Sequence, residues 1–439
     1  EPRASLNADA SFLLNAAGDN GLLQLKRFEL QAEQASLVGS GEINFEGKQV
    51  FKLQAKMTQS NPAHWWLAPQ GKLDGEVNLQ GSLAAKAIVK LQLPGVSGEL
   101  SGHKFSASGR VDWQQSTSVM FEQLEMQWGA NTLSANGAIG NSQSQLQLHL
   151  RADELALFES LTGFSLTGVA SADAVVSGSL DALSATVKLH AEDLRSASGF
   201  ALAQLDGDLQ LGTNPQDPLK LQLIAKDIKS AGISLQAEQK NTQGLTLEKR
   251  RNLLEQLQIS VNGSLRQHTI EARAQFDQGQ GRLLSMQAQG GMLAEVNNSS
   301  KRSSKASIQE NLDVANTWLG QLLQFKLSGF GAQSGSSMPA EDMVLQAAMN
   351  LRLSPSKLSL GAAQFAGGFG KLNLDHLEWT PKSLSTKAKW DALPVMAIAH
   401  LIKPQDSLHG DIRLGVNWDL QLKDHVRGEL QVQRQSGDL

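Results

Sequence analysis

The residues that could do chemistry are few, and most of them sit in repeated units. Asp74 with Glu76, and Asp206 with Asp208, have the residue types of a general acid and base. Both pairs follow a leucine in the same Leu-Asp-Gly-acid unit. A repeated unit of this kind favours a turn or an outer-face position over a catalytic pair.

Other catalytic and metal-binding patterns are missing from the sequence. None of the nine histidines forms a pair at metal-ligand spacing, and His149 and His190 lie in alternating segments where a surface position is expected. The chain contains no cysteine, which excludes thiol nucleophiles and disulfides. Gly367, Gly368 and Gly370 lack the further glycine and helix of a nucleotide loop and indicate a turn or bulge. We therefore expect no catalytic residue, no metal site and no cofactor, and we do not expect an enzyme.

The dominant pattern is the alternation of apolar and polar residues. It is clearest in the closing stretch 408–439, where every second residue from Ile412 to Leu422 is apolar. Alternation places the apolar residues on one face of an extended strand and the polar residues on the other. Similar units begin upstream at Leu73, Leu166 and Leu205. Most of the chain is predicted to repeat this unit.

The length and charge of the chain fit such a repeated plan. The 439 residues carry a net charge of only -4, which indicates no nucleic-acid partner. The alternating runs predict roughly 25 short strands, more than an open twisted sheet usually holds. The expected fold is all-β, an elongated curled β-sheet, groove-like or taco-like, with a few short helices. At ~4.8 Å per strand, its axis would run to roughly 120 Å.

Several segments interrupt the alternation. Leucine and phenylalanine at spacings of three predict a short amphipathic helix over 153–163. Helical spacing also predicts a helix over 312–327, and a last short helix is expected over 392–402. A helical turn is expected within 62–69, where two prolines bracket a Trp-Trp-Leu run.

These interruptions give a predicted domain division. The polar, low-complexity segment 290–311 is expected to be a mobile loop. The regions predicted are groove repeats over 1–289, the loop over 290–311, and a helix with further groove repeats over 312–439. The chain begins without methionine and stops just after a strand, so we expect a segment of a longer protein that is cut at both ends.

The inward register of the strands is the candidate binding site. It is almost free of charge and contains many small residues, so it leaves space that an acyl chain could fill, at ~0.8 kcal/mol for each buried CH₂. A core filled by the protein's own side chains satisfies the same pattern, and the pattern alone does not decide between them. The residues predicted to face the groove are Val77, Leu79, Leu91, Leu146, Leu148, Leu150, Leu221, Leu223, Ile259, Val261, Ala272, Met349, Leu351, Leu414, Val416 and Trp418.

The sequence resembles the TamB group of AsmA-like proteins from Gram-negative envelopes. The resemblance rests on the repeated Leu-x-Gly units, on short helices between strand runs, and on the closing residues. Those closing residues are Trp418-Asp-Leu420, Gly428-Glu-Leu430, Arg434 and Ser436-Gly-Asp438.

The resemblance implies a location and partners. It implies a β-groove in the periplasm, attached to the inner membrane by an anchor outside this segment and reaching an outer-membrane partner of the Omp85 type, TamA. It implies phospholipid transport between the two membranes. The alternative within the family is an outer-membrane protein assembly or translocation factor that works by β-augmentation. A surface β-solenoid adhesin is a third interpretation, which the irregular repeat lengths disfavour.

Overall fold

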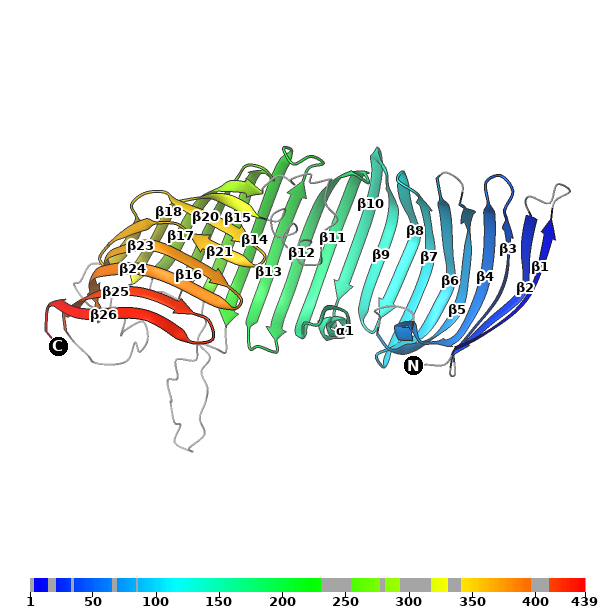
Figure 1. Cartoon of the computed structure of the whole chain (residues 1–439), viewed down its shortest axis with the longest axis horizontal. Helices are drawn as coiled ribbons and strands as arrows, with labels where there is room; N and C mark the ends of the chain where they lie inside the picture. Colours follow the sequence, from blue (N-terminus) through cyan, green and yellow to red (C-terminus); the bar gives the residue numbers. More distant parts are fainter. Residues whose placement is uncertain are drawn as a thin grey trace, which may run out of the picture. The chain divides into compact units, whose positions relative to one another are not determined.

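The computed structural model describes residues 4–14, 21–32, 35–64, 69–83, 86–229, 254–276, 281–292, 317–330, 341–395 and 410–438. In this part of the chain nearly all regular structure is antiparallel β-strand (Figure 1). The chain divides into two compact units, Glu1–Ser198 with Gln204–Asn214, and Gly199–Ala203 with Pro215–Leu439. The division falls within β13 (Ala201–Leu211). The predicted all-β class of curled, repeated amphipathic strands is confirmed.

The first unit is a meander in which each strand pairs with the next. Its strands are β1 (Ala4–Leu14), β2 (Gly21–Ala32), β3 (Ala35–Asn44), β4 (Val50–Ser60), β5 (Gly71–Ser82), β6 (Ile88–Leu100), β7 (His103–Gln114), β8 (Ser118–Trp128), β9 (Asn131–Ile139), β10 (Asn141–Ala152), β11 (Leu166–Ser179) and β12 (Ala182–Ser196). All neighbours are antiparallel. Short hairpins suffice because antiparallel strands need no crossover.

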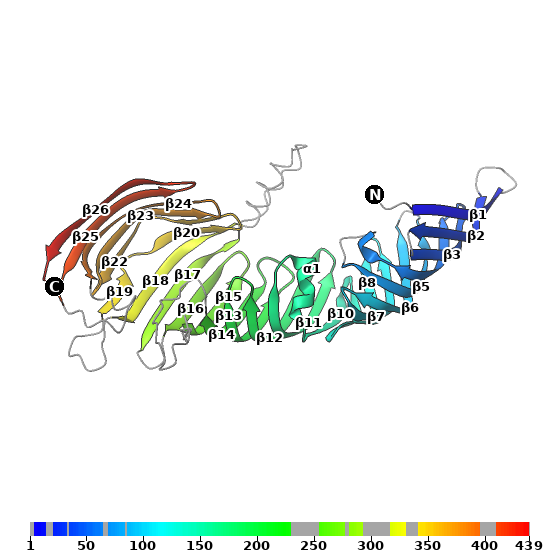
Figure 2. The same ribbon diagram turned by 90° about the horizontal axis from the view of Figure 1, so that it is seen from below.

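The second unit is also antiparallel. Its strands are β14 (Pro218–Lys229), β15 (Leu254–Ser264), β16 (His268–Phe276), β17 (Arg282–Met292), β18 (Trp318–Phe330), β19 (Glu341–Leu345), β20 (Met349–Ser354), β21 (Lys357–Leu360), β22 (Ala363–Gly367), β23 (Gly370–Thr380), β24 (Ser383–Pro394), β25 (Arg413–Leu422) and β26 (Val426–Ser436). Between β18 and β23 the pairing departs from a simple meander. Seen from below, β18 to β26 form a strongly arched sheet (Figure 2).

The sheet of the second unit contains two matching strand breaks. β18 pairs with both β19 and β20, which are separated by residues 346–348. β21 and β22 are separated in the same way by residues 361–362, and both pair with β23. The two breaks therefore lie at matching heights in adjacent strands, while β18 and β23 run past them as continuous strands.

β-Bulges bend the strands elsewhere. The register shifts in most strand pairs of the first unit, for example between Phe121 and Leu124 of β8. At this bulge Gln123 adopts a left-handed φ of 47°. A bulge adds one residue to one strand and increases its local bend and twist. Repeated bulges therefore curl a sheet whose hydrogen-bonded ladder is otherwise regular.

The single short helix predicted over 153–163 is present as two consecutive helical turns. They are a 3₁₀ turn, η2 (Leu155–Phe158), followed by the single-turn helix α1 (Glu159–Thr162). Gly163 ends α1 with a left-handed φ of 71°, and its N–H donates to the Glu159 carbonyl at 2.8 Å. Glycine suits this position because it carries no Cβ. The turn expected within 62–69 is present as η1 (Pro62–His64), and its Trp-Trp-Leu run lies outside the described residues.

The predicted helix over 312–327 is wrong from Trp318 onward, where the chain forms β18. Residues 312–316 lie outside the described part. A bulge in β18 shifts the register between Leu322 and Gln324. Leu322 and Phe325 therefore face the same side although they are three residues apart, and this spacing resembles that of a helix.

Two other predictions fall partly outside the described residues. The first three residues of the helix expected over 392–402 end β24 instead, and 396–402 are not described. Ala392 occupies a bulge there, with a φ of 56°. The loop expected over 290–311 begins with the last three residues of β17, and 293–311 are not described.

A buried histidine helps to hold the second unit together. His268 is 6% exposed and Trp318 is 5% exposed. The Trp318 indole N–H donates to His268 Nε2 at 2.8 Å, and His268 Nδ1 lies 2.8 Å from the Ser264 carbonyl. These contacts define a neutral imidazole with its proton on Nδ1. β15, β16 and β18 are thereby linked through one side chain.

Replacing His268 with leucine should destabilise the second unit. The substitution leaves the buried Trp318 N–H without an acceptor, which costs about 1–3 kcal/mol of unfolding free energy. Urea unfolding followed by tryptophan fluorescence measures this loss. His425→Leu is the matched control, because His425 is exposed. An equal midpoint for His268→Leu and the control would contradict the assignment.

Candidate functional site

Rows of apolar side chains cross the strands of the first unit. Residues paired across antiparallel strands lie on the same face, so the strand registers define these rows directly. Row A consists of Gly41, Leu53, Leu79, Leu91, Val111, Phe121, Gly137, Leu146, Val176 and Ala185. Row C consists of Leu37, Met57, Gly75, Val96, Ala107, Met126, Leu133, Leu150, Ala172 and Leu189.

Row B lies between them and is rich in small residues. It is interrupted at two bulges and contains Gly39, Ala55, Val77, then Leu93 and Gly109, then Leu124, Ala135, Leu148, Ala174 and Val187. Ala55 and Ala135 are buried at 8% and 3% exposure by their neighbours. Half of the residues in row B are glycine or alanine. No charged residue occurs in rows A, B or C.

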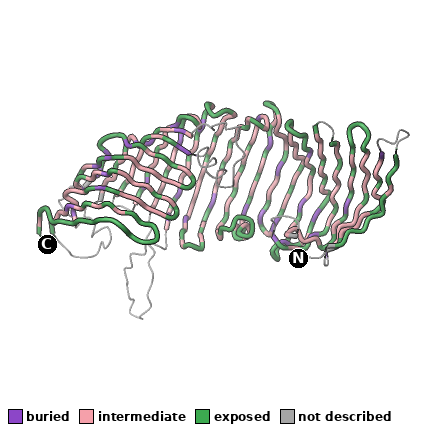
Figure 3. Tube along the Cα trace, viewed as in Figure 1, coloured by how far each residue is buried: buried purple, intermediate pink, exposed green. Residues whose placement is uncertain are grey.

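The larger side chains of these rows are half-buried. Leu79, Leu91 and Leu150 are intermediate in exposure, while Leu146 is buried at 5%. Each side chain is flanked by its own row and by adjacent rows. The burial pattern of the strands alternates (Figure 3). Neighbouring side chains on the same face bury the sides of each apolar residue, and most of these residues stay only half-buried.

The six groove residues predicted in the first unit lie together on this face. Leu79, Leu91 and Leu146 belong to row A, Val77 and Leu148 to row B, and Leu150 to row C. The strand registers therefore place these six residues on one face of the sheet. That these side chains contact a lipid stays a prediction.

The groove residues predicted at the start of the second unit also share a face. Leu221 pairs with Val261, and Leu223 pairs with Ile259, which pairs in turn with Ala272. Further along, Val416 pairs with Trp390, and Trp418 pairs with Ala388. Leu414 pairs with Leu393. Met349 is 2% exposed and belongs with Leu351 to the main hydrophobic cluster of this unit.

The short helices cover one margin of the apolar face in the first unit. Leu157 and Phe158 of η2 pack against a cluster formed by Leu73, Val96, Leu100 and Trp128. The rings of Trp128 and Phe158 meet edge to face, with 5.7 Å between centroids. The Trp128 indole N–H donates to the Leu100 carbonyl at 3.0 Å.

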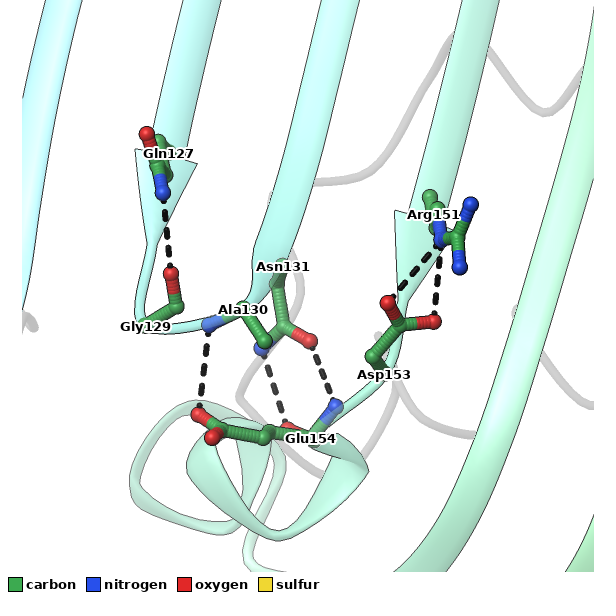
Figure 4. Close-up of polar contacts among 7 residues, drawn as sticks. All are labelled: Gln127, Gly129, Ala130, Asn131, Arg151, Asp153 and Glu154. Atoms are coloured by element: carbon green, nitrogen blue, oxygen red, sulfur yellow. Dashed lines mark hydrogen bonds and ion pairs between the residues drawn. The ribbon is translucent and has the colours of Figure 1, made fainter.

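Polar contacts fix this cover to the sheet (Figure 4). Asn131 Nδ2 donates to the Glu154 carbonyl at 3.0 Å, and the Glu154 N–H donates to Asn131 Oδ1 at 2.8 Å. The Ala130 N–H donates to the Glu154 carboxylate at 3.3 Å. Asn131 is 3% exposed, so this reciprocal pair satisfies a buried amide. The sequence predicted the helix but not its contacts with Trp128 and Asn131. Local sequence patterns do not indicate which strand residues a helix inserted between two strands will contact.

The opposite face of the first unit carries charged pairs. Lys90 Nζ lies 3.0 Å from the Asp112 carboxylate, and Arg110 lies 2.6 Å from Glu122. A depression of about 720 Å³ on β6 to β11 is lined on this face by small hydroxyl side chains such as Ser106 and Ser134. The polar pattern of the sequence therefore corresponds to a charged, hydrated face.

The chemistry-bearing residues of the sequence also lie on the polar face. His149 Nδ1 is 2.6 Å from Asp173, and His190 contacts Asp206 at 2.6 Å and Glu192 at 3.1 Å. These are surface hydrogen bonds between histidine and carboxylate side chains. Hydrogen bonds to Asp206 and then Glu192 raise the pKa of His190 above its ordinary value.

The described residues contain neither a metal-binding cluster nor a membrane-spanning helix. Within them no three His, Asp or Glu side chains are grouped so as to hold a metal ion. No helix among the same residues has the length and hydropathy to cross a bilayer.

Together these features define an all-β protein whose curled sheets carry one apolar and one charged face. The family model for the TamB N-terminal domain matches residues 7–292, and the chain belongs to the TamB family. This family comprises periplasmic, envelope-spanning transport or assembly modules that are not enzymes. The matched range includes the six groove residues of rows A to C but ends before the closing residues that carry the resemblance. Comparisons with curated proteins and with solved structures found no match.

The pKa of His190 should fall when Asp206 is replaced with asparagine, because the carboxylate that stabilises the imidazolium is lost. NMR titration of the histidine ring signals measures the change. A raised folded-state pKa also means that this pair stabilises the fold below the unfolded-state pKa, and that the contribution is lost as the pH rises through the folded-state pKa. An unchanged titration in Asp206→Asn would contradict this assignment.

Proposed function

We propose that this chain is a periplasmic segment that moves phospholipids between the inner and outer membranes, with their acyl chains on the apolar face. The observation that supports the proposal is the continuity of rows A and C. Each crosses ten strands, β3 to β12, without a charged residue. Ten strands at ~4.8 Å spacing extend such a surface over roughly 45 Å.

The energetics favour an apolar ligand on this surface. Half-buried leucine and valine side chains would gain burial from a covering chain, and each CH₂ that leaves water contributes ~0.8 kcal/mol. The charged pairs of the opposite face offer no such gain. A bound lipid would therefore be oriented with its acyl chains against rows A to C and its polar headgroup in water.

The proposal includes partners that the family suggests. These are phospholipids, a TamA-like outer-membrane protein of the Omp85 type, and the inner membrane through an anchor outside this segment. No catalytic residue or cofactor is needed, because the path consists of side-chain surfaces alone.

Charged substitutions on the apolar face should remove bound lipid. Leu91→Asp and Leu148→Asp place carboxylates in rows A and B, where a charge in contact with hydrocarbon costs about 3 kcal/mol, so retained lipid should fall at least about tenfold. Mass spectrometry of organic extracts from the purified protein measures the lipid.

Neighbouring residues supply matched controls. Gln92→Asp and Gln147→Asp add the same charge one residue along the same strands, on the polar face. They should retain lipid as the unsubstituted protein does, and circular dichroism should confirm folding of all four variants. Lipid absent from the unsubstituted protein, or retained equally by all variants, would refute the proposed path.

Outer-membrane protein assembly is a second candidate function, and one observation favours it. β26 pairs with β25, and along its whole length its residues are exposed, including Val426, Leu430 and Val432 at 67%, 60% and 55%. An exposed strand edge with apolar side chains can accept a client strand by β-augmentation.

Proline substitutions in β26 test this second function. Gln431→Pro and Gln433→Pro remove backbone donors from the strand, which should reduce client assembly and leave lipid retention unchanged. Crosslinking to a nascent outer-membrane protein and lipid extraction from the same preparation provide the two measurements. Unimpaired assembly in the proline variants would exclude augmentation at β26.

A further inference from the structure

The second unit fills its own interior between β17 and β24. Ten buried residues of these strands, with Phe369 in the turn between β22 and β23, form one hydrophobic cluster that includes Trp318, Met343 and Phe365. Twelve half-buried apolar side chains pack against it, including Phe325 and Trp390. The cluster of the first unit contains only four buried residues, at the margin covered by η2.

Aromatic side chains close this interior. The rings of Phe325 and Phe365 meet edge to face with 5.4 Å between centroids. Phe365 lies on β22, which pairs with β19, and β19 pairs with β18, the strand that carries Phe325. Strands two positions apart are about 9.6 Å apart in a flat sheet. The rings therefore lean toward each other across Leu345, itself buried at 7% exposure.

A second aromatic contact fixes the same interior. The Trp390 indole N–H donates to the Phe369 carbonyl at 2.7 Å, and Phe369 is 4% exposed. A half-buried indole whose N–H is hydrogen-bonded is restricted in its orientation.

We infer that the aromatic cluster of β17 to β24 is a protein-filled barrier, and that acyl-chain contact belongs to rows A to C of the first unit. This inference rests on the proposed function and specifies where along the chain it operates. Interiors of proteins are packed at close to crystalline density, so a chain of CH₂ groups enters the cluster only if side chains leave. Rows A to C need no such displacement.

The inference separates the predicted groove residues into two groups. Leu79, Leu91 and Leu148 contact the acyl chain. Met349 and Leu351 contact protein, as members of the cluster. The same apolar alternation thus serves a ligand surface in one unit and a core in the other.

Site-specific photocrosslinking tests the inference. A diazirine-bearing leucine analogue is placed at Leu91 or Leu148 in the first unit, and at Leu351 or Leu372 in the cluster. The full chain is mixed with vesicles of phosphatidylethanolamine and phosphatidylglycerol and irradiated, and lipid adducts are identified by mass spectrometry. The same analogue at Gln147 and Asn350, both exposed, gives the background.

Lipid adducts at Leu91 and Leu148, with Leu351 and Leu372 at background, are the expected result. Adducts at all four positions would overturn the barrier and leave the lipid path intact. Adducts confined to Leu351 and Leu372 would overturn the assignment to the first unit. Adducts at none of the positions would reject the proposed function itself.

A variant that opens the cluster gives an independent test. Phe325→Ala with Phe365→Ala removes the ring pair, and an apolar cavity of this kind can take up an apolar ligand. With the analogue at Leu351, the double variant should gain a lipid adduct that the parent lacks. Circular dichroism should show that the variant is folded. A folded variant that still gives background labelling would show that these rings do not close the interior.

Discussion

Side-chain alternation along a strand is the constraint on which this structure depends. Residues that pair across adjacent strands lie on the same face of the sheet. A single misplaced charge would therefore interrupt an apolar row that crosses many strands. Rows A and C pass through ten strands without such an interruption. The charged pairs, including Lys90 with Asp112, are confined to the other face for the same reason. The apolar face and the charged face are therefore the two sides of a single sheet layer.

The two units use this constraint differently. In the first, small residues in row B and a cover limited to η2 and α1 leave much of the apolar face half-buried. In the second, eleven buried residues form one hydrophobic cluster, within which the rings of Phe325 and Phe365 meet. Bulges increase the local bend and twist of the strands in both units.

Much of the fold followed from local sequence. Alternation predicted the all-β class, and it placed Leu79, Leu91 and Leu148 on a common face. The helix predicted over 312–327 failed because the bulge in β18 places Leu322 and Phe325 on one side at helical spacing. The docking of Phe158 on Trp128, and the buried pairing of His268 with Trp318, join residues far apart in sequence. Periodicity carries no information about such contacts.

The bulges have a consequence for how this kind of chain can change its length. One extra residue inside a regular strand would turn every following side chain to the wrong face. At a bulge, such as Gln123 in its left-handed conformation, the extra residue is absorbed and the following residues keep their side. Single-residue insertions within strands are thus tolerated here without exchanging the apolar and charged faces. Two related strands can therefore differ in length by one residue at a bulge, while the hairpin loops at their ends keep the same length.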